Sequence, residues 1–211
     1  MKGLRKITGR LYAGALVKFQ HSKTTFESGI DSSQNVHVNG LGPTVSYDSR
    51  DNVQYPRTGM YASISFFFNP SWMGSDKVFN SIRSFVNWYW TVNKKDVFAA
   101  RISAFSSLGN VPFVGQHTVG GRDIRGYSVG KYRGDQQYSV QAEYRWNFYR
   151  RWGAVGFFGA AFVEKPSSGA LPAGGIGIRF KIIRSRDINI GLDGALGKDD
   201  SGFYFRIGEA F

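Results

Sequence analysis

The chain has 211 residues, a formal net charge of +12, 27 glycines and no cysteine, and 16% of its residues are aromatic. This composition favours strands over helices, and it excludes a disulfide scaffold and a thiolate metal site. The size suits one domain, so we treat residues 1–211 as one unit. No run of about 18 apolar residues predicts a transmembrane helix.

The first residues, MKGLRKITGRLYAG, are basic but lack the apolar segment of about 7 to 15 residues that a secretory signal requires. If the chain is an envelope protein, which is made with such a signal, we expect it to be a mature fragment, an engineered form or a renumbered one.

The first half of the chain predicts five strands, because apolar and polar residues alternate in segments bounded by Gly, Pro, Asn, Asp and Ser. In the third and fourth of these segments, the alternate residues that share a face are apolar or aromatic. The five segments are residues 9–20, 39–48, 60–68, 82–92 and 97–108.

Residues 109–136 form a link that contains VGGRDIRGYSVGKYRGDQQ. A link of about 27 residues without an apolar period is too long for a passive turn between two strands. Its glycines permit tight turns, and Arg122, Arg125 and Arg133 offer guanidinium groups that can bind carboxylates. The link predicts a functional loop; the alternative is a mobile surface loop.

The second half predicts five more strands, at residues 138–148, 153–164, 176–182, 188–192 and 203–211. The first of them, YSVQAEYRWNF, has the clearest alternation, whereas 153–164 does not alternate clearly and its register stays open. The last segment predicts a strand that would close the wall of a β-barrel. Glu209 interrupts the apolar face of this strand, and we expect its carboxylate to lie at the level of the membrane interface. That face carries Phe203, Phe205, Ile207 and Phe211.

Cations recur on the polar faces of the predicted strands. An unpaired buried charge is very costly, so the core of a soluble sandwich seldom carries arginine on strand after strand. A transmembrane antiparallel β-barrel, with an apolar face toward lipid and a polar lumen, explains the pattern. The alternative is a soluble sandwich with these cations on its solvent face. The cations are Arg83, Arg101, Arg145, Arg179, Lys181 and Arg206.

A periplasmic C-terminus would fix the direction of every strand. The short links 93–96, 149–153 and 184–187 would then be periplasmic, and 109–136 would be an extracellular loop. Aromatic residues would gather at the periplasmic interface as a girdle. These residues are Trp88, Trp90, Trp146, Phe148 and Trp152.

Four tracts, in this order, resemble the C-terminal barrel of the BamA/TamA superfamily of outer-membrane assembly and translocation barrels, also called the bacterial surface antigen family. LGPTVSYDSRDNVQYPRTGMY (41–61) is similar to an early strand and turn, and GGRDIRGY to the signature of the long sixth extracellular loop. VQAEYRW resembles the next strand, and SGFYFRIGEAF the closing strand. The resemblance covers nearly the whole chain.

The resemblance implies that loop 109–136 folds into the lumen and is held there by Arg125, Gly126 and Tyr127. In the family, the signature arginine pairs with acidic residues on the inner barrel wall. Glu143 fits independently, since it lies on the polar face of the next strand. Where a second acid is common, this chain has Gly159; the other candidate lumen acids are Asp48 and Asp193.

The resemblance also implies a non-enzymatic barrel that assists the insertion or translocation of proteins at the bacterial outer membrane. Relatives usually have sixteen strands and periplasmic POTRA domains. About ten strands therefore form either a small barrel or the C-terminal part of a larger one, or two chains combine. Implied partners are outer-membrane lipids, lipopolysaccharide, substrate barrels and accessory lipoproteins. The alternative function is a passive pore or a structural scaffold.

Enzymatic, metal and nucleic-acid sites are weakly supported. Residues 126–130 match G-x-S-x-G, but Ser128 lacks the preceding strand and following helix of a nucleophile elbow. The pair His21 and Asp31 has nothing to position it. The three histidines lack a metal-ligand spacing, and the cations form no single stripe for nucleic acid. We expect no cofactor and no metal.

Overall fold

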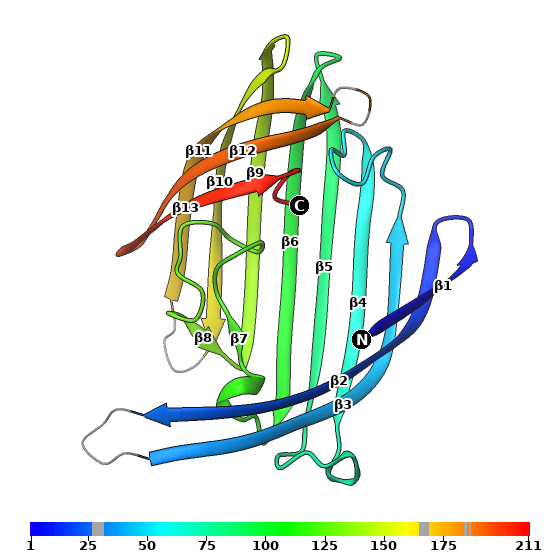
Figure 1. Cartoon of the computed structure of the whole chain (residues 1–211), viewed down its shortest axis with the longest axis vertical. Coiled ribbons are helices and arrows are strands. Elements are labelled where there is room, and N and C mark those ends of the chain that lie inside the picture. Colours follow the sequence, from blue (N-terminus) through cyan, green and yellow to red (C-terminus); the bar gives the residue numbers. More distant parts are fainter. Residues whose placement is uncertain (27–31, 165–168, 184, 186) are drawn as a thin grey trace.

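The computed structural model describes residues 1–26, 32–164, 169–183, 185 and 187–211. Its main element is an antiparallel sheet of eleven strands in the order β1-β2-β3-β4-β5-β6-β9-β10-β11-β12-β13, and β7 and β8 form a separate pair (Figure 1). The strands are β1 (Lys2–Thr8), β2 (Leu11–Phe26), β3 (Ser32–Asp48), β4 (Gly59–Asn69), β5 (Phe79–Val92), β6 (Asp96–Gly109), β7 (His117–Thr118), β8 (Arg133–Gly134), β9 (Gln136–Tyr149), β10 (Trp152–Glu164), β11 (Gly169–Ile183), β12 (Ile188–Gly197) and β13 (Asp200–Ile207).

The predicted all-β class is confirmed, and each of the ten predicted segments forms a strand of the main sheet. Strand β1 was not predicted. Its apolar residues Leu4 and Ile7 do not alternate, and all seven of its residues are exposed. Pairing with β2, and not a shared apolar face, therefore defines β1.

The sheet has an apolar outer face and a polar inner face. On the outer face Ile176 and Phe203 are 76% and 94% exposed, whereas Arg145 and Asp193 on the inner face are 2% and 1% exposed. A protein that faces water on its outside would reverse this arrangement, so the outer face suits lipid. The same alternation fixes the register of β10, whose inner face carries Phe157.

The strands at both ends of the sheet curl toward the inner face (Figure 1). At one end, Val36 and Val38 of β3 pack against Val111 and Val114 of the long loop. At the other end, β11 to β13 contact the middle of the same loop. Among the described strands no pairing joins β1 to β13, so each of them has one unpaired edge.

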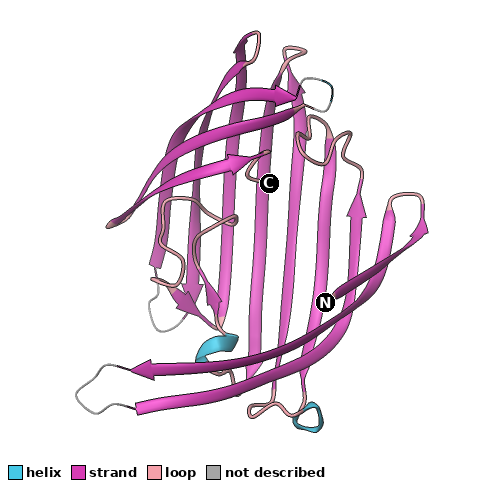
Figure 2. Ribbon diagram, in the orientation of Figure 1, coloured by secondary structure: helices cyan, strands magenta, loops and turns pink. Residues whose placement is uncertain are grey.

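Helices contribute little to the part of the chain that the structure describes. They are two single turns, η1 (Ser71–Met73) and η2 (Phe113–Gly115), both in links between strands (Figure 2). Neither has the length or the apolar content needed to cross a membrane.

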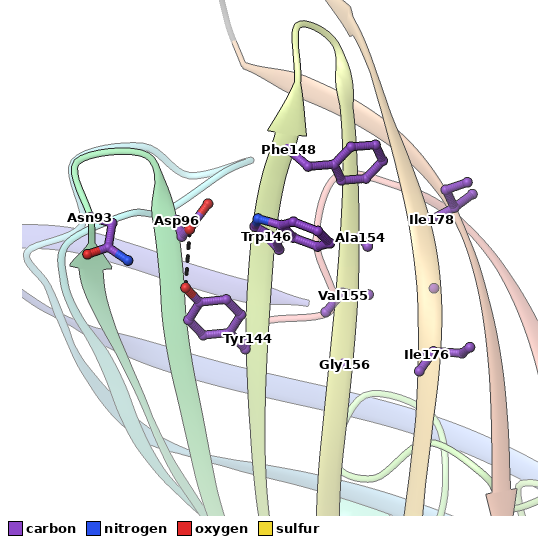
Figure 3. Close-up of a pocket in the computed structure, with 11 residues that line it drawn as sticks. Asn93, Asp96, Tyr144, Trp146, Phe148, Ala154, Val155, Gly156, Ile176 and Ile178 are labelled. Carbon is purple, nitrogen blue, oxygen red and sulfur yellow. Dashed lines mark hydrogen bonds between the residues drawn. The ribbon is translucent and has the colours of Figure 1, made fainter.

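Aromatic side chains gather on the outer face near the links 93–95 and 150–151. Trp146 and Phe148 of β9 lie beside a groove of about 800 Å³ over Ala154 and Gly156 (Figure 3). The groove exists because β10 has small residues on its outer face between the bulky residues of β9 and β11. Aromatic pairs with ring centres 4.9–5.7 Å apart join neighbouring strands or residues here: Trp90 with Phe98, Trp146 with Phe148, and Trp152 with Phe180.

The end of the chain differs from the prediction. Strand β13 ends at Ile207, and Gly208 has a φ of +86°, which favours glycine and interrupts the alternation. Phe211 therefore turns to the inner face and packs against Tyr89, instead of lying on the outer face with Phe203. Glu209 likewise points inward, where its carboxylate meets Arg179, and does not lie at the lipid interface.

Candidate functional site

The loop between β6 and β9 lies against the inner face of the sheet (Figure 1). Near its middle, the carboxylate of Asp123 accepts a hydrogen bond of 2.6 Å from Arg101 of β6. Its middle segment contacts β9, β11, β12 and β13 through Arg125, Gly126, Tyr127 and Ser128, which hold it at several points along the sheet. The loop thus joins strands that do not pair with one another.

Arg125 is fully buried, and its guanidinium group has partners on every side. Nη2 donates to Glu143 at 2.5 Å, Nη1 donates to Asp193 at 3.0 Å, and Nε donates to Gln141 at 3.2 Å. The guanidinium carbon lies 3.5 Å from the ring centre of Phe157. Charge-assisted hydrogen bonds of this kind are strong, and burial excludes the water that would compete for them.

Arg125 belongs to a larger group that we call the charge cluster. Glu143 also pairs with Arg145 at 2.6 Å, and Asp193 also pairs with Arg206 at 2.9 Å. Arg179 bonds Asp193 and reaches Glu209 at 3.0 Å. Glu209 also lies 3.8 Å from Arg145. Four arginines thus share three carboxylates, and each carboxylate pairs with at least two of them, so removal of one charge takes a partner from several buried groups at once. The charge cluster is Arg125, Glu143, Arg145, Arg179, Asp193, Arg206 and Glu209.

Glycines create the space in which the loop lies. Gly126 has a φ of +106°, and a Cβ there would lie 3.0 Å from the backbone of Leu196 on β12. A Cβ at Gly197 would lie 2.6 Å from the carbonyl oxygen of Gly126 and from the ring of Tyr127. At Gly191, it would lie 2.6 Å from Arg179 Nη1. Any side chain at these positions would displace the loop or an arginine.

The residues after Arg125 fasten the loop to the last strands. The Gly126 N–H donates to the Tyr204 hydroxyl at 2.8 Å, and the Ser128 N–H donates to Asp200 at 2.9 Å. The hydroxyl of Tyr127 donates to the Pro172 carbonyl oxygen at 2.5 Å and accepts the Lys198 N–H at 3.0 Å. Burial raises the pKa of Tyr127 above its usual range, so this hydroxyl stays protonated.

The base of the loop contains a buried histidine. Nε2 of His117 lies 3.1 Å from the hydroxyl of Ser107, and the imidazole packs at 5.5 Å from the ring of Phe105. Burial, together with the nearby charge of Arg83, lowers the pKa of His117 to about 4. The imidazole is therefore neutral near pH 7.

The structure brings together most of the residues predicted for the loop site. Arg125 meets both Glu143 and Asp193, and the latter replaces the acid that Gly159 of β10 does not supply. Asp48 lies elsewhere, paired with Arg50 at 2.7 Å. Phe203, Phe205 and Ile207 lie on the outer face of β13, and Phe211 does not.

Among the contacts of Arg125 and the members of the charge cluster, three residues were not predicted from the sequence to face the lumen: Gln141, Phe157 and Glu209. Gln141 shares the inner face of β9 with Glu143, so the alternation of residues along this strand could have predicted that Gln141 faces the loop. Phe157 could have been found only once the register of β10 was known. Glu209 gave no local signal, because the break at Gly208 reverses the face that alternation assigns to it.

The hydroxyl of Ser128 contacts the carboxylate of Asp200 at 3.2 Å, within a loop that lacks the strand-to-helix turn of a nucleophile elbow. Asp31 lies outside the described residues. Within the described ranges, no group of three or more His, Cys, Asp or Glu residues is arranged to hold a metal ion.

Comparison with known proteins agrees with the fold. The family model of the Omp85 superfamily domain matches residues 18–211. No curated protein sequence matches the chain. The superfamily comprises outer-membrane barrels that assemble and translocate proteins, as the resemblance to BamA/TamA-like barrels implied. Because the family match covers most of a chain whose sheet has an apolar outer face and a polar inner face, the chain belongs to the Omp85 superfamily.

Proposed function

We propose that this chain assists the insertion or translocation of proteins at the bacterial outer membrane, without making or breaking covalent bonds. The observation that carries the proposal is the contact between the loop and the edge strand β13. Gly126 and Ser128 bond Tyr204 and Asp200 of this strand, and Arg206 belongs to the charge cluster. The loop thus holds the inner face of β13 and leaves its edge open.

The open edge of β13 supplies the chemistry that the proposal needs. The Gly208 N–H donates to the Asn189 carbonyl oxygen of β12 at 2.8 Å. Because the direction of backbone groups alternates along a strand, the N–H and C=O groups of Phe203, Phe205 and Ile207 point away from β12. An incoming strand can pair with these groups, as in β-strand addition.

We further propose that the C-terminus is periplasmic and that loop 109–136 enters the lumen from the extracellular side. The aromatic residues near the short links support this orientation, because such residues gather at membrane interfaces. The outer face would contact lipids and lipopolysaccharide. Substrate barrels and accessory lipoproteins are the proposed protein partners.

An insertion assay tests the function directly. The protein is placed in liposomes, and the folding rate of an added substrate barrel is measured with the parent, with Phe205→Pro and with Phe205→Ala. Proline removes one N–H from the open edge at a position where an edge strand tolerates it. Alanine removes the side chain and keeps the N–H. We expect the parent and Phe205→Ala to accelerate folding and Phe205→Pro to lose the effect.

Equal activity of the two Phe205 variants would contradict pairing at the β13 edge. A steady conductance from the parent protein, without any acceleration of substrate folding, would instead support the passive pore. Conductance is therefore recorded on the same liposomes.

A further inference from the structure

Two histidines face each other on the outer face of the sheet, on strands β2 and β3. His21 and His37 are cross-strand partners, and the neighbours of His37 on its own strand, Val36 and Val38, are buried on the inner face. Asp76, in the link between β4 and β5, lies beside His37. This group shares no residue with the charge cluster and plays no part in the proposed function.

The geometry of the two rings is that of a chelate. Nδ1 of His21 lies 2.9 Å from Nε2 of His37, and the ring centres are 4.4 Å apart. A metal ion about 2.0–2.1 Å from each nitrogen, with an angle of about 90° between the two bonds, places the nitrogens about 2.9 Å and the ring centres about 4.5 Å apart. A straight N–H···N bond would hold the ring centres farther apart, at about 5 Å.

Asp76 orients His37 for this role. One carboxylate oxygen, Oδ2, lies 3.1 Å from Nδ1 of His37 and also accepts the His37 backbone N–H at 2.7 Å. The Asp76 N–H in turn donates to the His37 carbonyl oxygen at 3.1 Å. A carboxylate that accepts the Nδ1 proton leaves the Nε2 lone pair free, as in carboxylate–histidine–metal triads.

The type of ion follows from the donors and the angle. Imidazole nitrogens suit Cu(II), Ni(II) and Zn(II), whereas Mg²⁺ and Ca²⁺ prefer oxygen ligands. The 90° angle is the one found in tetragonal Cu(II) and Ni(II) sites, and tetrahedral Zn(II) would need the nitrogens about 0.4 Å farther apart. The His37 side chain is 50% exposed and lies beside Asp76 of the link between β4 and β5, at the rim of the sheet, where water can complete the coordination.

We propose that His21 and His37 form a cross-strand site for a divalent transition metal, with Cu(II) bound most tightly, and that Asp76 is a positioning residue for His37. Two nitrogen ligands from adjacent strands would hold β2 and β3 together at this end of the sheet. Val36 and Val38 on the opposite face of β3 pack against the start of the long loop, so this hairpin also supports the loop.

Titration of the folded protein in detergent with Cu(II), and separately with Ni(II) and Zn(II), tests the site. The variants are His21→Ala, His37→Ala and Asp76→Asn, and the matched control is Asn35→Ala, an exposed change on the same face of β3. Electron paramagnetic resonance of the Cu(II) form counts the coordinated nitrogens. Heat modifiability on gels verifies that every variant is folded.

We expect one Cu(II) site with two imidazole nitrogens. Either alanine variant should lose about 100-fold in affinity, because one ligand replaces a chelate, and Asp76→Asn should lose about 10-fold while two nitrogens remain bound. Asn35→Ala should bind like the parent. Parent-like affinity in either folded alanine variant, or tighter binding of Zn(II) than of Cu(II), would overturn the proposal.

Discussion

Different interactions stabilise the inner face of the sheet in its N-terminal and C-terminal parts. In β3 and β4 the inner face carries hydroxyl pairs between adjacent strands, such as Ser46 with Ser63 at 2.9 Å and Thr44 with Ser65 at 2.8 Å. In β9 to β13 it carries the charge cluster, in which Arg125 joins β9 to β12 through the loop. The hydroxyl pairs hold neighbouring strands together, whereas the charge cluster holds a loop and four strands.

The difference predicts where substitutions matter most. Loss of one neutral hydrogen bond costs about 1 kcal/mol, because water can replace part of it. Loss of one charge from a buried group costs about 3–5 kcal/mol, because the buried charges that remain each lose a partner that water does not replace. The C-terminal strands should therefore tolerate change less well than β3 and β4.

The largest effect is expected for Arg125→Met. It leaves Glu143 and Asp193 with fewer cations in a buried site, so the free energy of unfolding should fall by about 3–5 kcal/mol. Urea unfolding in detergent micelles measures this, with Ser46→Ala as the control from the other end of the sheet. Equal losses in the two variants would remove the distinction between the ends.

A double-mutant cycle sharpens the same point. Arg125→Ala and Glu143→Ala should destabilise non-additively, with a coupling energy of about 0.5–3 kcal/mol. The measurement is urea unfolding of both single variants and of the double variant. Additive losses would show that the two side chains do not interact in the folded protein.

A pH dependence is the next largest effect. His117 takes up a proton near pH 6.5 when unfolded but only at about pH 4 when folded, so the unfolded state binds more protons between these values. Stability should therefore fall as the pH decreases from 6.5 toward 4, by up to about 3 kcal/mol. Unfolding is measured across this range for the parent and for His117→Gln, whose curve should be flatter. Parallel curves of stability against pH for the parent and for His117→Gln would contradict the assignment of this pH dependence to His117.

A smaller loss is expected where the loop crosses β12. Gly197→Ala places a Cβ against Gly126 and Tyr127, and overpacking of this kind costs about 1–3 kcal/mol. The control is Gly194→Ala on the same strand, where the nearest atom lies 3.6 Å away. Thermal unfolding and protease cleavage of the loop should separate the two variants. A control as unstable as Gly197→Ala would point to strand propensity as the cause.

The smallest effect is expected for Tyr127→Phe. It removes the hydroxyl that bonds Pro172 and Lys198 but keeps the ring in its apolar cluster, so the loss should be about 1 kcal/mol. Thermal unfolding measures it. A loss as large as that of Arg125→Met would mean that Tyr127, and not the charge cluster, holds the loop.

Local alternation predicted the strands and their faces wherever apolar and polar residues differ clearly, as in residues 138–148. It did not resolve β10, because glycine and alanine lie on both faces and Phe157 and Phe158 are adjacent. The structure fixes the register of β10, because the ring of Phe157 packs against the guanidinium group of Arg125 on the inner face.

The site was predictable only in part for a similar reason. The loop tract and the resemblance indicated Arg125 and Glu143. Arg125 pairs with Asp193 and not with Asp48 because of contacts between residues far apart in the sequence. The alternation of residues along a strand does not predict such contacts. The inward turn of Phe211 depends on the backbone conformation of Gly208.

The position of the loop can be tested by a single cross-link. The chain has no cysteine, so Ser128→Cys with Asp200→Cys introduces one pair, at side chains that now meet at 3.2 Å. Oxidation should join β13 to the loop rapidly, more slowly when Arg125→Met is added, and not at all in the control pair Ser128→Cys with Ser22→Cys. Failure to cross-link, or a rate that Arg125→Met does not change, would contradict a loop held on the inner face by the charge cluster.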